Sequence, residues 1–262
     1  MNRIRRAYVE TSFGQNHYRS LPGDGIPLVL LHQTPSSSAM YEHLMRALDG
    51  VFPTIALDTP GFGNSDALDG EVTIAHYAHT LYAALTALAV RECWVLGHHT
   101  GASIAVQMAT DYPQWVRKLA LSGPPYFTVA EKVALKNSAP SSEMQPDGSH
   151  LAAMWQRIRG NNPAAPLEIS TRETLLAVQA VKPFAAAYRA VSEHNFEQQL
   201  AALDCPVLVL AGEHDSLRAN LEPAYAALRR GAMRVIAGAD TYLCETHAEI
   251  LAGILREYFL QQ

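Results

Sequence analysis

Short apolar runs and longer stretches with helical spacing alternate along most of the chain. Runs of four or five apolar residues suit buried strands, and the stretches between them are long enough for helices. This alternation predicts an α/β fold, with a mostly parallel sheet covered by helices on both faces. The runs that we expect to form strands are residues 27–31, 54–57, 93–96, 119–122, 207–211 and 233–236.

The clearest helical pattern begins at Thr73. Apolar residues recur there every three or four positions from Ile74 to Leu88, so they share one face of a helix. An amphipathic helix at 250–259 is expected to close the fold. Shorter helices are expected at residues 40–48 and 102–110.

The pattern changes between residues 124 and 203. No run resembles a strand there, Pro and Ser cluster from 137 to 149, and helical patterns occupy 151–159 and 171–197. We predict a helical cap inserted into one core domain, which consists of residues 1–123 and 204–262. This predicted insertion, residues 124–203, is called the cap segment below.

Length and charge narrow the class of protein. A chain of 262 residues with 48% hydrophobic content can bury a sizeable core, and the length suits one α/β domain with a modest insertion. The formal net charge is −5, and the 20 Lys and Arg residues are scattered. Because neutralising phosphates requires a basic stripe, we expect no nucleic-acid partner.

Cysteine usage and hydropathy suggest a location. Cys93, Cys205 and Cys244 are odd in number and widely spaced, which is typical of reduced thiols and not of a disulfide framework or a zinc knuckle. The N-terminus lacks the apolar core of a signal peptide, and no run approaches the ~20 apolar residues of a membrane span. We expect a cytoplasmic protein with no membrane partner.

The strongest motif is a glycine-flanked pair of histidines, Gly97-His98-His99-Thr100-Gly101. It lies between an apolar strand and a small-residue helix, where G-x-Nuc-x-G forms a sharp strand-to-helix turn. Glycines on both sides keep the neighbouring strand and helix from colliding with the turn. The middle residue, His99, is therefore the side chain that the turn displays.

With this motif in place, the sequence resembles the α/β-hydrolase superfamily along essentially the whole chain. It is most similar to capped members such as epoxide hydrolases, dehalogenases and carbon–carbon bond hydrolases. Residues 30–35 (LLHQTP) resemble the H-G-x-P oxyanion loop of that family, and residues 57–65 (LDTPGFGNS) resemble its D-x-P-G-x-G-x-S turn. The resemblance implies a doubly wound sheet of about eight strands with an inserted helical cap.

Two further stretches assign the remaining catalytic positions by resemblance. Residues 210–215 (LAGEHD) match the strand and loop that present the triad acid, which points to Asp215. Residues 245–249 (ETHAE) resemble the E-x-P-E stretch that opens the last helix. Counting back from this stretch places the catalytic histidine position at Thr241.

The sequence therefore departs from the family pattern twice. The elbow carries His99 where serine, cysteine or aspartate is usual, and Thr241 stands where the catalytic histidine is usual. In the usual triad the acid holds an imidazole, which takes a proton from the nucleophile. We hypothesise a relocated pair in which Asp215 accepts a hydrogen bond from one nitrogen of His99, leaving the other nitrogen free as a base.

An ordinary imidazole, with a pKa near ~6.5, suits general-base catalysis near neutral pH. His99 could activate water against an ester, a lactone or a β-diketone carbonyl. The family resemblance implies that the backbone N–H groups of Thr34 and Thr100 hold the oxyanion. Gln33 replaces the usual glycine of the oxyanion loop and could add a side-chain donor. The leading prediction is a cofactor-independent hydrolase of a small carbonyl-containing molecule.

Other interpretations remain open. The same residues could act as a lyase or decarboxylase without attack by water, or His99 could attack directly and form an acyl-histidine. A ligand-binding protein that has kept the pocket and lost the chemistry is a third possibility. His98, His99 and Asp215 could form a metal site. We expect none, because His98 occupies a position whose side chain is usually turned into the packing in this family.

Side chains of the cap segment are expected to set substrate size and polarity. The aromatic candidates could equally be packing residues, and the histidine candidates could supply an additional acid or base. A homodimer is left open. The candidate pocket residues of the cap segment are His150, Trp155, Phe184, Tyr188 and His194.

Overall fold

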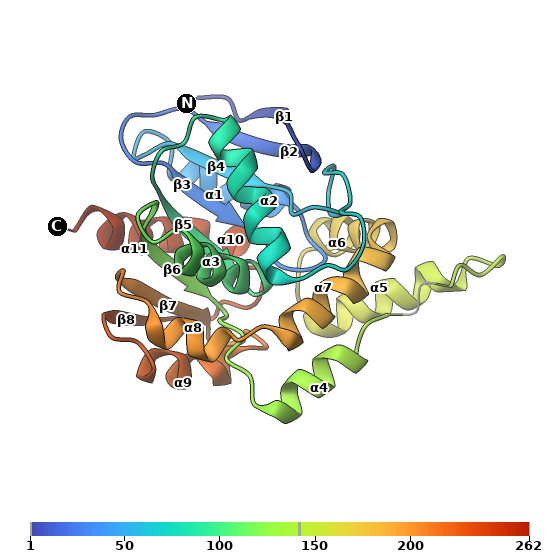
Figure 1. Cartoon of the computed structure of the whole chain (residues 1–262). Helices are drawn as coiled ribbons and strands as arrows, with labels where there is room; N and C mark the ends of the chain where they lie inside the picture. The colour runs from blue at the N-terminus through green and yellow to red at the C-terminus, as the bar shows by residue number, and fades with distance from the viewer. Residues whose placement is uncertain (1, 141–142, 262) are drawn as a thin grey trace.

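The computed structural model describes residues 2–140 and 143–261, and over these ranges eight strands form one sheet (Figure 1). The spatial order is β1-β2-β4-β3-β5-β6-β7-β8, parallel from β4 to β8, with β1 and β2 antiparallel at one edge. The predicted fold class is confirmed. The strands are β1 (Arg5–Thr11), β2 (Gly14–Leu21), β3 (Leu28–Leu31), β4 (Thr54–Leu57), β5 (Cys93–His98), β6 (Val116–Ser122), β7 (Val207–Gly212) and β8 (Gly231–Ile236).

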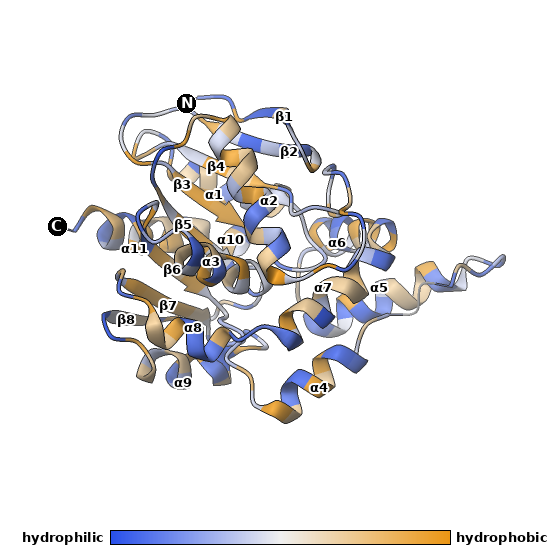
Figure 2. Ribbon diagram, in the orientation of Figure 1, coloured by the Kyte–Doolittle hydropathy of each residue, from blue (hydrophilic) through white to orange (hydrophobic). Residues whose placement is uncertain are grey.

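Helices cover both faces of the sheet, which explains why the central strands are apolar throughout. In β3, Val29 and Leu31 pack into one core cluster while Leu28 and Leu30 pack into the other, and all four are fully buried. Figure 2 shows these central strands as hydrophobic ribbon inside the helical layers. One layer contains α2 (Ile74–Ala87), α3 (Thr100–Asp111), α8 (Phe196–Ala202) and α9 (Leu221–Ala226); the other contains α1 (Glu42–Ala47), α10 (Leu243–Thr246) and α11 (Ala248–Leu260).

Four helices of the cap segment lie together beyond the carboxyl ends of the parallel strands (Figure 1). They have a small apolar cluster of their own, formed by Met154, Ile158, Ala177 and Phe184. Helix α8 instead packs against α3 and contributes to the core of the sheet domain. The four are α4 (Val129–Asn137), α5 (Ser149–Asn161), α6 (Leu167–Gln179) and α7 (Val181–Glu193).

Several elements differ from the sequence-based expectation. Strands β1 and β2 were not expected, because their residues are largely polar and the strands lie at an edge that is apolar on one side only. Helix α4 was not expected either, since none of its residues is fully buried. The single helical stretch expected at 171–197 is divided among α6, α7 and α8, with breaks at Ala180 and at His194–Asn195. None of the described helices is long and apolar enough to cross a membrane.

Candidate active site

The candidate catalytic residues follow three strands that lie close together in the sheet. Thr34 lies beyond β3, His99 follows β5, and Asp215 follows β7, with β6 between the last two strands. In chain order, β4 is added on one side of β3, and the later strands β5 to β8 are added on the other side. The connections that leave the carboxyl ends of β3 and β5 therefore run in opposite directions. This divergence at the carboxyl ends is where open α/β sheets bind ligands.

The turn from β5 into α3 holds His99 in an unusual backbone conformation, with φ of +49° and ψ of −109°. The two flanking glycines permit it. A Cβ on Gly97 would lie 2.3 Å from the carbonyl oxygen of Gly101, and a Cβ on Gly101 would lie 2.0 Å from that of Leu31. Close packing of strand against helix therefore fixes the turn and displays the His99 side chain.

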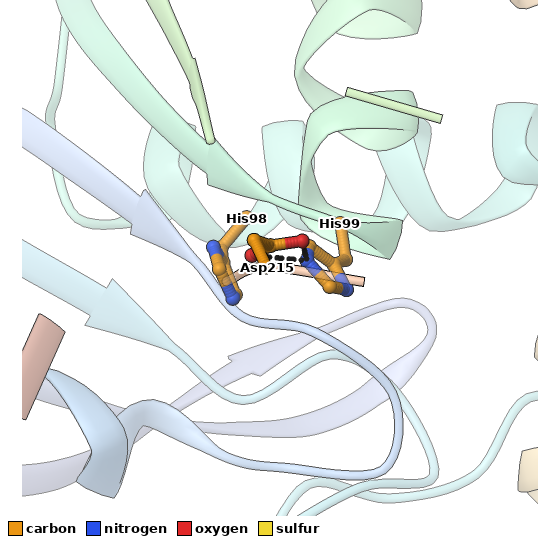
Figure 3. A group of neighbouring side chains, drawn as sticks. All are labelled: His98, His99 and Asp215. Atoms are coloured by element: carbon orange, nitrogen blue, oxygen red, sulfur yellow. Dashed lines mark hydrogen bonds and ion pairs between the residues drawn. The ribbon is translucent and has the colours of Figure 1, made fainter. Parts of the chain in front are cut away.

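His99 and Asp215 form the hydrogen bond that the sequence predicts (Figure 3). Nε2 of His99 lies 3.0 Å from both carboxylate oxygens of Asp215. The Asp215 side chain is completely buried, whereas 15% of the His99 side chain is exposed. If Nε2 carries the proton and donates it, the lone pair is on Nδ1. Within the described parts of the chain, Nδ1 of His99 has no hydrogen-bond partner.

A glycine makes room for the imidazole. Strand β6 lies between β5 and β7, so the ring must pass over the end of β6 to reach Asp215. Gly123 is the first residue after β6, and a Cβ there would lie 2.4 Å from both Cδ2 and Nε2 of His99. Its φ of +56° also favours glycine. Sequence reasoning missed Gly123, although a glycine directly after a buried strand was the available signal.

The charge of Asp215 is stabilised by its neighbours. Burial alone would raise the pKa of this carboxyl group, but attraction to His99 and the hydrogen bond from its ring lower the pKa to about 2. The backbone N–H of Leu217 also donates to Oδ1, at 2.7 Å. Asp215 therefore holds the turn after β7 as well as the imidazole.

His98 is a neutral neighbour of this pair. Its side chain is fully buried, and Nδ1 lies 2.8 Å from Oγ of Ser122. Burial, reinforced by repulsion from His99, lowers the pKa of His98 to about 3, although Asp215 opposes the shift. His98 is uncharged at neutral pH, so His99 is the imidazole of this pair that is placed to exchange a proton with a ligand.

The two histidines and Asp215 have ligand atoms within 4.8 Å of one another, the one such grouping among the described residues. The two rings stack with their centroids 4.3 Å apart and their planes 23° from parallel. Imidazole lone pairs lie in the ring plane, so nearly parallel rings direct them side by side and not at one tetrahedral ion. This geometry favours a hydrogen-bonded pair over a metal centre.

The backbone donors predicted for the oxyanion are free. Across residues 2–140 and 143–261, the N–H groups of Thr34 and Thr100 donate to no acceptor. His32 holds the loop before Thr34 in place, since its Nδ1 donates to the carbonyl of Gln33 at 2.8 Å and its Nε2 accepts from the N–H of Thr59 at 2.9 Å. Two unpaired donors next to an imidazole are the elements of an oxyanion hole.

Asp58 holds the neighbouring turn. Its buried carboxylate accepts from the N–H groups of Ser38 at 2.6 Å and Asn64 at 2.9 Å, and from Nδ1 of His17 at 2.8 Å. Burial alone would raise the pKa of Asp58, but these hydrogen bonds, that of His17 first, lower it to about 2. The turn and the oxyanion loop therefore share a rigid polar support.

Two predicted site residues lie away from the cavity beside His99. Gln33 is buried, and its carbonyl accepts from His32 and from the N–H of Ser36, but its side chain does not line the cavity. Thr241 is half-buried in the turn after β8 and does not line it either. Both residues therefore stay predictions from the sequence, and neither contacts the cavity.

A cavity of about 130 Å³ adjoins His99, Thr34 and Thr100. A larger hollow of about 640 Å³ near Phe13 and His79 contains none of the predicted catalytic residues. We therefore take the smaller cavity as the candidate site, because the free imidazole nitrogen and the unpaired donors belong to residues that line it. Its other lining residues are Pro125, Phe127, Leu135, Tyr188, Val191, Ser216 and Leu217.

Of the five candidates in the cap segment, the structure brings Tyr188 to the cavity. Phe184 lies behind it, 1% exposed, with the two rings edge to face and their centroids 4.8 Å apart. Trp155 lies beside Arg159, and His150 lines a separate hollow of the cap segment.

His194 is buried where α7 ends, and its Nε2 donates to the side-chain oxygens of Gln107 and Gln199 at 3.1 and 2.8 Å. It is therefore placed as a link between the cap segment and α3. Sequence reasoning did not single out Phe127 and Leu135, since the segment that carries them has no strong periodicity.

Comparisons with known proteins agree with this fold. A sequence model for the alpha/beta hydrolase fold matches residues 26–247. The chain is 28% identical to 2-(acetamidomethylene)succinate hydrolase of Mesorhizobium japonicum over 238 residues, which cover 87% of this chain and 86% of that protein.

Solved structures share the fold. Cfl2 of Burkholderia cenocepacia superposes with a TM-score of 0.84 at 23% identity, covering 98% of this chain and 96% of that one. A hydrolase from Pseudomonas aeruginosa superposes with a TM-score of 0.82 at 21% identity, covering 98% of both chains. The predicted resemblance is confirmed: the chain belongs to the α/β hydrolase family.

Proposed function

We propose that this protein is a cofactor-independent hydrolase of a small carbonyl compound, with His99 as the general base. The substrate class is an ester, a lactone or a β-diketone whose carbon–carbon bond is cleaved. The observation that carries the proposal is the hydrogen bond between Nε2 of His99 and Asp215, which leaves Nδ1 without a partner among the described residues.

The proposed reaction begins when Nδ1 of His99 takes a proton from a water molecule as its oxygen attacks the carbonyl carbon. Nε2–H stays bonded to Asp215, whose negative charge stabilises the imidazolium that forms. The N–H groups of Thr34 and Thr100 donate to the developing oxyanion. When the intermediate collapses, the bond to the leaving group breaks and Nδ1 returns its proton to that group.

The placement of Nδ1 supports this role. It lies two bonds from Cβ of His99, close to where the hydroxyl oxygen of a serine at the elbow would lie one bond from Cβ. The base therefore occupies the part of the site where a family member would place its nucleophile. His99, Thr34 and Thr100 line the same cavity, so we expect a bound carbonyl to keep the orientation that an oxyanion hole requires.

The relative from Mesorhizobium supports hydrolysis of a small molecule, since its name is that of a hydrolase acting on a compound with an acetamido group. Its substrate is not proposed for this chain. The named compound is a succinate with two carboxylates, and the described residues that line the cavity beside His99 include no Lys or Arg.

The direct test is turnover of a panel of activated esters, lactones and β-diketones by the wild type, His99→Ala, His99→Ser and Asp215→Asn. Wild type is expected to turn over a panel member, and both His99 variants to lose at least about 100-fold in kcat/KM. Asp215→Asn is expected to lose about 1000-fold, because an amide also allows the tautomer with the proton on Nδ1. Activity that persists in His99→Ala would refute the proposed base.

Two further measurements separate the alternatives. In ¹⁸O-labelled water, hydrolysis must place the label in product, whereas a lyase or decarboxylase acting without water attack leaves it unlabelled. A burst of the first product equal to the enzyme concentration would indicate an acyl-histidine in place of base catalysis. If wild type turns over no panel member while panel compounds still raise its Tm, the protein binds ligands without this chemistry.

A further inference from the structure

The cavity beside His99 has a specific chemical character. Among the described residues that line it, none is Lys, Arg, Asp or Glu. Apart from His99, its polar groups come from Thr34, Thr100, Ser216 and the Tyr188 hydroxyl. The Asp215 carboxylate contacts His99 and repels anions. A carboxylate brought into this cavity would therefore lose its hydration without gaining a cation.

The basic side chain next to the cavity is separated from it. The guanidinium of Arg157 lies over the ring of Phe184, 5.6 Å from its centroid, and Arg157 lines a different hollow of the cap segment. Phe184 in turn backs the Tyr188 ring. Arg157 also hydrogen-bonds the side chain of Tyr188, and burial raises the pKa of this phenol although Arg157 opposes the shift. Arg157 is therefore already engaged in holding Tyr188 in place.

The size of the cavity sets a second limit. Its volume is about 130 Å³. An apolar cavity of about 150 Å³ accommodates benzene, which has six heavy atoms. The cavity beside His99 therefore has room for a group of about five or six heavy atoms. Tyr188 closes one side, and its ring is held edge to face against the buried Phe184.

We propose that the cavity selects an uncharged, apolar acyl group of about five or six heavy atoms, and that Tyr188 sets the upper limit of its length. The proposal rests on the proposed function in that this acyl group carries the carbonyl held by Thr34 and Thr100. It goes further by naming the substrate class: short-chain neutral carbonyl compounds, to the exclusion of carboxylated ones.

Binding tests this selectivity without depending on turnover. Pentanamide and succinamate are similar in length, and the second carries a carboxylate in place of an apolar end. By NMR titration of wild type at pH 8, pentanamide is expected to bind at least about tenfold more tightly than succinamate. Leu135→Arg adds a cation to the lining from α4, a helix with no fully buried residue, and is expected to narrow this difference. Equal affinity of wild type for the two amides would overturn the proposal.

Tyr188→Ala tests the length limit. Wild type is expected to bind octanamide at least about tenfold more weakly than pentanamide, since the longer chain exceeds the space, and Tyr188→Ala is expected to reverse this order. Tyr225→Ala makes the same change at an exposed side chain of α9 and is expected to leave the order of affinities as in wild type. An unchanged order in Tyr188→Ala would refute the role of Tyr188.

The two proposals fail in different ways. Suppose that wild type prefers neutral amides, that His99→Phe abolishes their binding, and that no ester is turned over. Hydrolysis is then refuted, and the selectivity of the cavity stands. If esters are turned over and succinyl esters react as fast as pentanoyl esters, hydrolysis stands and the selectivity is refuted.

Discussion

At the scale of single residues, the candidate site depends on the contact between His99 and Asp215. The sequence could predict that His99 reaches Asp215, because both lie in motifs whose order along the chain is characteristic of the family. It could not reveal Gly123, because the clash of a Cβ with the imidazole depends on β6 lying between β5 and β7. Local sequence specifies the turn that displays the ring, and the order of strands specifies what the ring crosses.

Gly123→Ala is therefore expected to displace the His99 ring. The added Cβ would lie 2.4 Å from Nε2, so kcat/KM should fall at least about 100-fold. Gly50→Ala is the matched control, because Gly50 also has positive φ, at +79°, but open space around its Cβ position. Both variants should lose stability from backbone strain in a thermal melt, and only Gly123→Ala should lose activity. Full activity in Gly123→Ala would contradict the ring position.

Removing the ring should leave a space that a free imidazole can fill. His99→Gly suits the positive φ of the turn, and it leaves the carboxylate of Asp215 beside an open space over Gly123. Added imidazole can act there as a separate general base, and it is expected to raise the rate of His99→Gly at least about tenfold. This increase should saturate with imidazole concentration. The double variant His99→Gly/Asp215→Asn supplies the comparison. Equal rescue in both would mean that Asp215 does not orient the base.

At the scale of secondary structure, strands with uniform apolar character were predicted well and elements with mixed character were not. β3, β5 and β7 are buried on both faces, so composition alone identified them. β1 and α4 bury few side chains, and tertiary pairing determines their structure. The charged contacts between cap segment and core were equally invisible, because their partners are far apart in sequence.

One such contact connects α6 to the oxyanion loop. Glu173 is 1% exposed, and its Oε1 accepts from Oγ of Ser36 at 3.0 Å and from Nη2 of Arg172 at 2.7 Å. Arg172 also pairs with both carboxylate oxygens of Glu245 next to the last helix, at 2.6 and 2.7 Å. Ser36 lies two residues from Thr34, so this cluster holds the cap segment against the loop that contains Thr34.

Glu173→Gln is expected to lower kcat about tenfold with little change in KM, because a loosened Thr34 donor matters most in the transition state. Steady-state kinetics on the panel ester with the highest turnover measure kcat and KM separately. Glu168→Gln, an exposed change on the same helix, is the control. Ser36→Ala combined with Glu173→Gln should add little to either single change. A fall in Tm with unchanged kcat would indicate a purely structural contact.

At the scale of the whole molecule, buried neutral histidines link the fold to pH. Burial lowers the pKa of His194 to about 4 and that of His98 to about 3. In the unfolded chain an imidazole titrates near ~6.5. The unfolded chain therefore binds protons that the folded chain does not, so the stability contributed above pH 6.5 is progressively lost as the pH falls toward 4.

The free energy of unfolding should fall by about 2 kcal/mol per buried histidine between pH 8 and pH 5. His194→Gln keeps a donor for Gln107 and should remove about 2 kcal/mol of this pH dependence in urea unfolding. His76→Gln, at an exposed histidine of α2, should leave the dependence unchanged. Identical pH dependence in His194→Gln and wild type would show that the pKa of His194 is the same in the folded and the unfolded chain.

The position of the cap segment between β6 and β7 also orders the assembly of the site during synthesis. His99 and Asp215 are 116 residues apart in the chain, and the whole cap segment is translated between them. At about 5–20 residues per second, Asp215 leaves the ribosome on the order of ten seconds after His99. A nascent chain that has not yet added β7 carries the imidazole without its carboxylate, so the pair can form only when the second half of the sheet is in place.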